Sequence, residues 1–451
     1  MKTTTSSIFK FLVFCTLALT AVPISINCAA FSLFPVHISI IAASLLLPFL
    51  PADDSLPPPS LNDFLPPAPI ALFALCSVFS FSMAVSHGGS LNLALRSFIP
   101  LFIALVPGSI IFKTAIRRNL LRYCFAGLFT ALIVTLAFGC AQYLKPQNIP
   151  DAKVGAFFRS AADMGGFLTL ALGFVAAGII TLRPVSLKII VSLLLMLGLL
   201  IILDGPSYWG IMLAFLAACS TAVVSALRPE RKSNILAVDT TSLRKPGRMS
   251  VFCFLIILGA TMLWQSTILP FLVRENEAAH FSSMAFFDAG NHKIKPHLAA
   301  WQTAACMGLA NSATGAGLGQ FEVFRDSYSE TVPFSEQQSF SGDQNQYLLL
   351  LAEGGLPFLL LGMAMLCSPF LRRRAPNAYD KNAALGSNAA EFIQIGSAIG
   401  VGGFAFASIN HPFITSGEHT ALLVFVLVLA IWARPAESPW EEHLGSGNIR
   451  L

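Results

Sequence analysis

Three arginines, Arg96, Arg159 and Arg325, are the residues of this chain best suited to binding a phosphate-bearing substrate. The planar guanidinium group presents a fork of donors that matches phosphate oxygens. An arginine in or beside an apolar segment is costly unless it reaches water or finds a partner. A cluster of such cations predicts a site for a diphosphate group. The alternative is that they are scattered, solvated charges paired with carboxylates such as Asp163 and Asp326.

Histidines provide the candidates for acid–base chemistry. Histidine changes between its neutral and charged forms near pH ~6.5 and can therefore act as a general base. A histidine in a loop is more often simply solvated, so its residue type alone singles out none of them. Six of the eight histidines lie on or beside segments that are expected on the outer side of a membrane, as these arginines are. They are His87, His280, His292, His297, His411 and His419.

The sequence gives no sign of a bound metal or cofactor. Most of the nine cysteines fall inside apolar runs, and the chain has neither a CxxC pair nor a metal-type Cys/His spacing. Gly315, Gly317 and Gly319 form a GxGxG run, but no strand of a βαβ unit precedes it. We therefore expect no nucleotide cofactor, and interpret the run as a sharp turn of the chain over the membrane surface.

Composition places these residues in a polytopic membrane protein. Of the 451 residues, 55% are hydrophobic and only 11% are charged, with a mean hydropathy of +0.71. Soluble domains carry roughly 25% charged residues. Repeated apolar runs of about 20 residues are typical of transmembrane helices. The sequence thus predicts an all-α membrane fold, and a net charge of +5 does not argue for nucleic-acid binding.

Twelve apolar runs predict twelve spans. Helices 1–9 are expected in residues 1–272, an outward loop with short helices in 273–346, helices 10–12 in 347–433, and a cytoplasmic tail in 434–451. The runs are Phe9–Ala29, Phe31–Leu50, Ile70–Ser86, Leu93–Phe112, Tyr123–Leu144, Gly165–Leu182, Ile189–Leu203, Tyr208–Leu227, Ser250–Val273, Tyr347–Leu371, Glu391–Asn410 and Thr420–Ala433.

The placement of basic residues predicts the orientation. One set of connections carries 20 of the 28 lysines and arginines, and such residues stay in the cytoplasm. Both termini are therefore expected in the cytoplasm, with the long loop outside. The apolar N-terminus resembles a cleaved signal peptide. We expect it to remain as the first helix, because the second apolar run follows almost directly.

Local patterns in and beside the long loop predict its structure. Ala299–Leu309 has helical spacing, with Trp301, Ala305 and Leu309 on one face. Glu353 lies one turn inside the tenth expected span, where a carboxylate should face a polar interior or an outer cavity. The residues that follow it are expected to break or kink that helix: Gly354, Gly355 and Pro357.

The order of these motifs resembles a known family. GAFFRSAADMGGF (155–167), a tight Ser-containing turn before a helix, HLAAWQTAACMGLANSATGAGLGQF (297–321) and GDQNQYLLLLAEGGLPFLLL (342–361) follow one another as in the O-antigen ligase/O-antigen polymerase superfamily of bacterial inner-membrane glycosyltransferases. The resemblance implies transfer of a glycan from a polyprenyl diphosphate-linked donor. The acceptor would be a hydroxyl on lipid A core, another glycan chain or a protein. No cofactor and no obligatory metal are implied.

The chain departs from the family pattern at the position of the base. The family has a histidine before the Asn, where this chain has Gln344, and an arginine before the loop Trp, where it has His297. In the tight turn the family's Ser-Arg is Ser207-Tyr208. Either the base has moved to Asp343 or His297, or the chain belongs to a divergent branch, or it no longer catalyses. The candidate substrate-binding residues are Arg159, Arg325, Arg96, Asp163, Asn345 and Glu353.

Two other functions stay open. The missing histidine leaves room for a non-catalytic relative that binds lipid-linked glycan or serves as a scaffold in surface-polysaccharide assembly. Twelve spans also fit a secondary transporter, but such proteins usually show two related halves. Here no internal repeat is visible, and the large loop follows the ninth span instead of the sixth. The sequence does not separate a ligase from a polymerase.

Overall fold

The computed structural model describes a helical protein with one short hairpin. The described residues are 2–22, 26–28, 31–51, 64–144, 158, 161–181, 185–203, 294–329, 345–369, 387–408, 414 and 419–432. Several expectations lie outside them, including the spans Tyr208–Leu227 and Ser250–Val273 and the candidate residues Arg159, Asp343 and Gln344.

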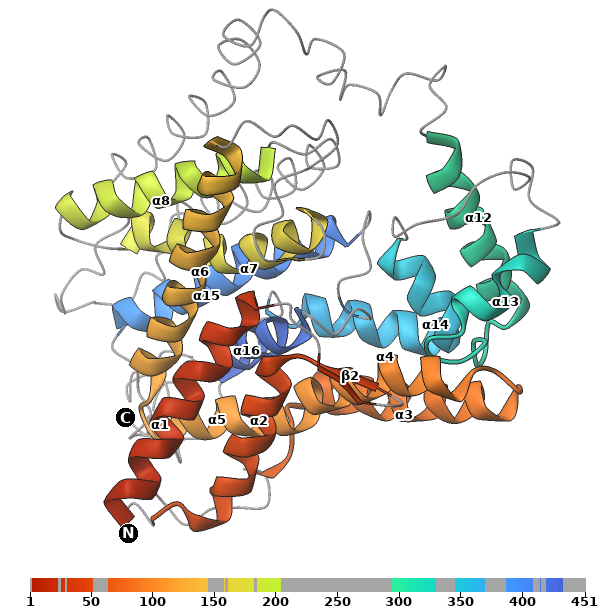
Figure 1. The fold of residues 1–451 in the computed structure, drawn as a ribbon, viewed down its shortest axis with the longest axis horizontal. Coiled ribbons are helices and arrows are strands. Elements are labelled where there is room, and N and C mark those ends of the chain that lie inside the picture. Colours follow the sequence, from red (N-terminus) through yellow and green to blue (C-terminus); the bar gives the residue numbers. More distant parts are fainter. Residues whose placement is uncertain are drawn as a thin grey trace, which may run out of the picture.

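The helices follow the apolar runs along the chain (Figure 1). In order, the elements are α1 (Lys2–Ala18), η1 (Leu19–Ala21), β1 (Ile26–Cys28), β2 (Phe31–Leu33), α2 (Pro35–Leu46), η2 (Leu47–Phe49), α3 (Ala68–Ser86), α4 (Leu91–Ile103), the π-helical η4 (Ala104–Gly108), α5 (Ser109–Arg117), α6 (Leu121–Leu144), α7 (Ala161–Thr181), α8 (Val185–Leu203), α12 (Ile294–Ala310), α13 (Phe321–Ser329), α14 (Gln346–Cys367), α15 (Ser387–Ala407) and α16 (Thr420–Trp432).

Five of the described helical segments are long and apolar enough to cross a membrane: Thr4–Ala21, Ala68–Ser86, Leu91–Arg117, Leu121–Gln142 and Gln346–Cys367. Each coincides with one of the expected spans. Further shorter apolar helices match other expected spans, including α7, α15 and α16. The expected all-α class is thus confirmed for the described residues, together with helices of membrane-spanning length.

The connection between the first two helices differs from expectation. The sequence predicted spans reaching Ala29 and starting again at Phe31, but the chain leaves the helix at Val22 and forms an antiparallel hairpin that pairs Ile26 with Leu33. Val22 precedes a proline and is extended, as residues before proline usually are. Hydrophobicity alone could not reveal this, because four of the six strand residues are apolar.

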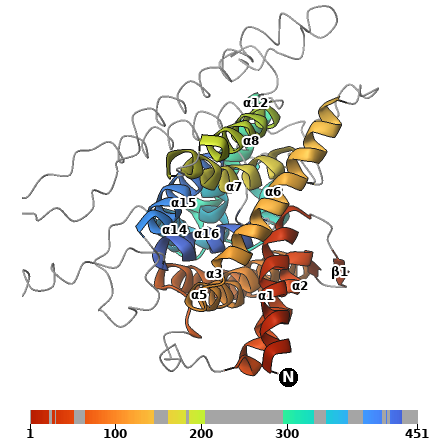
Figure 2. The same ribbon diagram turned by 90° about the vertical axis from the view of Figure 1, so that its left-hand side faces the viewer.

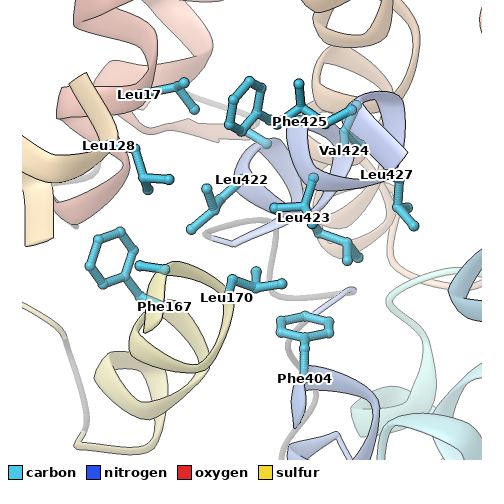
Figure 3. Close-up of a cluster of buried hydrophobic side chains, with 14 of the residues drawn as sticks. Leu17, Leu128, Phe167, Leu170, Phe404, Leu422, Leu423, Val424, Phe425 and Leu427 are labelled. Atoms are coloured by element: carbon cyan, nitrogen blue, oxygen red, sulfur yellow. The ribbon is translucent and has the colours of Figure 1, made fainter. Parts of the chain in front are cut away.

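The core lies around α16, which is apolar on every side and is buried from Ala421 to Leu429. Side chains from α1, α6, α7 and α15 converge on it (Figure 3). In Figures 1 and 2, α7 and α15 lie beside each other next to it. Gly173 allows their close approach, because a Cβ there would meet the backbone of Gly396 and Gly400. This core fixes the ends of α7, α15 and α16, where several candidate residues lie.

Candidate functional site

The loop after α12 and the bend of α14 hold each other. Gly355 has φ 71° and ψ −171° inside α14, so the helix is interrupted there as the sequence predicted. The loop donates from Ala316 N to Ala352 O at 2.9 Å and from Gly317 N to Glu353 O at 2.8 Å. In return Leu356 N donates to Ser312 O at 2.7 Å. The bend leaves backbone groups of α14 for the loop to pair with.

The glycines of this loop allow close contact with three helices. Gly315, Gly317 and Gly319 have φ of 70°, 107° and 73°, which side chains rarely adopt. A Cβ at Gly315 would meet the Glu353 backbone, and one at Gly317 would meet Ala84 of α3. The predicted sharp turn is confirmed. The loop packs between α3, α4 and α14, whereas the sequence suggested that it lay over a surface.

Glu353 lies beneath this loop with only 4% of its surface exposed. The backbone N–H groups of Gly319 and Phe321 lie beside its carboxylate, whose Oε2 has no hydrogen-bond partner among the described residues. Its backbone oxygen also accepts from Ser80 Oγ of α3 at 2.8 Å. The polar surroundings expected for Glu353 are therefore supplied by the loop backbone. In the described structure this candidate substrate-binding residue connects the loop to α14.

Gln320 is a structural residue that the sequence did not single out. Its buried amide accepts from Ser90 N at 2.7 Å and donates to Ser90 O at 2.9 Å. The side chain thus pairs with the backbone of the turn before α4, much as a neighbouring strand would. This pairing requires a glycine at position 89, because a Cβ there would overlap the Gln320 amide. Nothing in the local sequence pattern marks this pairing.

The first turn of α14 joins the ends of α15 and α16. Asn345 is the N-cap, and its Oδ1 accepts from Tyr347 N at 2.9 Å and Leu348 N at 3.2 Å. Gln346 N donates to Ser408 O at 2.9 Å, and Gln346 Oε1 accepts from Ile414 N at 2.8 Å. The tyrosine hydroxyl donates to the carbonyl of Ala405. The position before Asn345, where the family has its histidine, thus adjoins a well-anchored helix end.

Replacing Asn345 separates its capping role from substrate binding. Asn345→Ala is expected to lower the stability of the protein by about 1 kcal/mol, whereas Asn345→Asp retains the cap. Thermal melting in detergent measures the difference. If Asn345→Ala melts like the unchanged protein, the cap does not contribute to stability. If Asn345→Asp melts normally but loses glycan transfer, the side chain has a second, substrate-binding role.

Helix α12 runs parallel to the first part of α14. Gly308 lies against Leu351 and Ala352, and one turn further along Ser312 meets Leu356. Extended back along both helices, this register predicts Trp301 near the level of Asn345. His297 then lies one turn beyond, about 6 Å further along the axis. Asp343 and Gln344 lie outside the described residues, so a base at His297 or Asp343 stays a prediction.

The buried face of α12 is adjacent to the face of Trp301, Ala305 and Leu309 that the sequence predicted. Ala300, Ala304 and Met307 are buried, whereas Leu309 is 71% exposed. The helix itself was predicted correctly. Trp301 Nε1 and Gln302 Oε1 are buried, and neither has a hydrogen-bond partner among the described residues. Two polar atoms near the level of Asn345 are thus left for another polar group to satisfy.

Asp163 belongs to a buried pair that the sequence did not reveal. The helix begins at Ala161, so Asp163 lies in its first turn. Asp163 Oδ1 is 3.8 Å from His419 Nε2, with side-chain exposures of 8% and 1%. Phe158 packs against the imidazole with ring centroids 5.7 Å apart. The pair ties α7 to the start of α16.

This pair lies near the first turn of α14. Thr420, the neighbour of His419, donates from Oγ1 to Ile414 O at 2.9 Å. The N–H of the same Ile414 donates to the side chain of Gln346. The start of α14, the connection after α15 and the Asp163–His419 pair thus form one continuous end of the helix bundle. Two of the sequence candidates, Asp163 and Asn345, lie at this end.

The candidate arginines Arg325 and Arg96 lie on other helices. Arg325 is on α13, where Glu322 Oε2 lies 2.8 Å and Asp326 Oδ1 3.2 Å from its guanidinium. The carboxylate pairing suggested as the alternative for this arginine is thus present with Asp326. Arg96 is exposed on α4. Among the residues that the structure describes, no group of three or more His, Cys, Asp or Glu side chains could hold a metal ion.

Comparison of the chain with protein-family models and with curated proteins gives no match.

Proposed function

We propose that this protein transfers a glycan from a polyprenyl diphosphate-linked donor to an acceptor hydroxyl at the outer face of the bacterial inner membrane. In this proposal the chain crosses the membrane twelve times. Both termini are cytoplasmic, and residues 273–346 face outward. The enzyme would act in surface-polysaccharide assembly as an O-antigen ligase or polymerase. The proposal begins from the resemblance in motif order, because fold alone does not imply function.

The observation that carries the proposal is how the motif residues are arranged. Trp301, the three loop glycines, Asn345 and Glu353 all belong to one unit made of α12, the loop and α14. Gln346 of that unit accepts from Ile414 N, and Thr420 at the start of α16 donates to the carbonyl of the same Ile414. Motifs that are separate in the sequence thus support one helix end. A site that must align a donor and an acceptor needs such rigid support.

Glycan transfer from a diphosphate donor requires two things of the protein: positive charge at the leaving group and removal of one proton from the acceptor. A diphosphate is a good leaving group when fixed cations stabilise the charge that develops on it. Arg159 is our first candidate for this role, since Arg325 already faces two carboxylates. The acceptor hydroxyl must also lose its proton. We assign that step to His297, because the register of α12 predicts that it lies beyond the start of α14.

Replacing Arg159 tests the diphosphate site. Arg159→Ala is expected to lower transfer at least ~100-fold, as when a preorganised donor is removed from an oxyanion site. Arg325→Ala is expected to have a smaller effect. Arg117→Ala at the opposite end of the helices is the control. Surface glycan is measured in cells alongside the amount of protein. Normal glycan in both Arg159→Ala and Arg325→Ala cells would rule out the proposed role of these arginines.

One observation favours a second function. Gln344 occupies the place of the family's histidine, and glutamine is not a base at neutral pH. A protein that only binds lipid-linked glycan, or holds other enzymes near it, could keep the same helix framework without a base. Such a protein would bind the donor but would not release polyprenyl diphosphate.

A further inference from the structure

A second site lies at the other end of the first helices, away from the residues considered above. A cavity of about 420 Å³ opens where the first half of α1 meets the turn between α5 and α6. Its polar lining comes from Ser6, Lys10, Arg118, Asn119 and Arg122. Pockets that bind small molecules commonly measure about 300–1,000 Å³.

The lining carries three basic side chains, and none of the described residues that line the cavity is acidic. The two arginines are held in place. Arg118 donates from Nη2 to the carbonyl of Pro51 at 2.9 Å. Arg122 donates to the Tyr123 hydroxyl at 3.2 Å, and its guanidinium carbon lies 4.8 Å from the centroid of that ring. Arginines fixed in this way have already lost much of the freedom that binding an anion would otherwise cost.

The backbone adds to the positive field. Asn119 has φ 56°, the left-handed conformation that asparagine tolerates better than most residues. It turns the chain so that α6 begins at Leu121, immediately beside the cavity. The first N–H groups of a helix have no acceptor within it, and this end carries partial positive charge. The cavity thus combines three cations with a helix N-terminus.

The helices around the cavity indicate the source of an anion. Both Thr4–Ala21 and Leu121–Gln142 are long and apolar enough to cross a membrane. The distribution of lysine and arginine assigns the cavity end of these helices to the cytoplasm, where anionic lipids attract basic residues. On α1, Ile8 and Phe11 beside the lining residues are 45% and 63% exposed. An acyl chain can lie against these apolar side chains while its headgroup reaches the cations.

We propose that this cavity binds the phosphate of an anionic phospholipid headgroup. The phosphate oxygens accept from Lys10, Arg118 and Arg122, and the acyl chains lie along α1. The site is independent of glycan transfer, since it lies at the opposite end of the predicted spans and uses none of the residues assigned to that reaction. A bound lipid would brace α1 against α6, which already pack closely through Gly127.

Lipid binding to the purified full-length protein tests the site. Phosphatidylglycerol is expected to raise the melting temperature in an uncharged detergent, and phosphatidylcholine to leave it unchanged. The double variant Lys10→Gln/Arg122→Gln should bind phosphatidylglycerol at least ~10-fold more weakly, from about 1 kcal/mol per basic residue near the surface. The matched control is Arg117→Gln/Lys188→Gln, which removes the same charge from the same predicted side outside the cavity and should bind like the unchanged protein.

Three results would overturn the proposal. The first is equal phosphatidylglycerol binding by the double variant and its control. The second is equal stabilisation by inorganic phosphate without lipid, which would identify a soluble anion as the ligand. The third is lost binding in Lys10→Arg/Arg122→Lys, which keeps both charges and therefore should retain the lipid. A melting temperature near that of the unchanged protein in phosphatidylcholine shows that each variant is folded.

Discussion

Gly317→Ala is expected to destabilise the protein by about 2–5 kcal/mol, whereas Gly88→Ala is expected to cost only about 1–2 kcal/mol. Gly317 has φ 107°, and a Cβ there would overlap the backbone and side chain of Ala84 in α3. The strained backbone costs about 1–2 kcal/mol, as for a left-handed residue. Overlap inside a packed core adds about 1–3 kcal/mol. Their sum is a large part of the roughly 5–15 kcal/mol that stabilises a typical domain.

Gly88 provides a matched control. It has φ 70°, but a Cβ there would meet nothing within 4 Å. Gly88→Ala therefore carries the conformational cost without the overlap. Size-exclusion profiles and melting curves in detergent compare the two variants. If Gly317→Ala and Gly88→Ala have the same melting temperature, the loop does not pack against α3 as described.

His297→Gln is expected to lower glycan transfer by about 10²–10⁴-fold, the usual contribution of a general base. The expectation rests on the parallel packing of α12 and α14, since its extension back along both helices predicts that position 297 lies beyond the start of α14. Glutamine keeps hydrogen-bonding capacity but cannot take up a proton. Stability should change little, because the buried contacts of α12 come from Ala300, Ala304 and Met307.

Two further variants make this prediction sharp. His87→Gln changes an exposed histidine at the C-terminus of α3 and should leave transfer unchanged. Asp343→Asn tests the other sequence candidate and should have the smaller effect of the two. Both are compared with His297→Gln using the same donor and acceptor. Unchanged transfer in both His297→Gln and Asp343→Asn would show that the base has not moved to either position.

The helices were predictable because membrane-spanning segments have one dominant signal. A long apolar run fixes the place of a helix, so the bounds of α3, α6 and α14 fall within a few residues of those expected. The bend of α14 and the sharp turn at Gly315 were predictable for a local reason. Glycine and proline restrict or free the backbone at their own positions, whatever surrounds them.

Contacts between distant residues could not be found in the same way. Gln320 pairs with Ser90, 230 positions away in the sequence. Asp163 of α7 lies beside His419, which directly precedes α16. Each residue is ordinary in its own segment, and only the packing of the helices makes the pair. The hairpin at Ile26 was not predicted for another reason: most of its strand residues are apolar and continue the apolar run of the first helix.

The fate of the lipid-linked donor tests the proposed function most directly. Purified protein in proteoliposomes is given polyprenyl diphosphate-linked glycan from its own cells together with the cell's acceptor fraction, and free polyprenyl diphosphate is measured. We predict that free polyprenyl diphosphate forms together with glycan bound to the acceptor, and that both fall together in Arg159→Ala. Donor that is bound but never released by the unchanged protein would contradict glycan transfer and would favour the non-catalytic alternative.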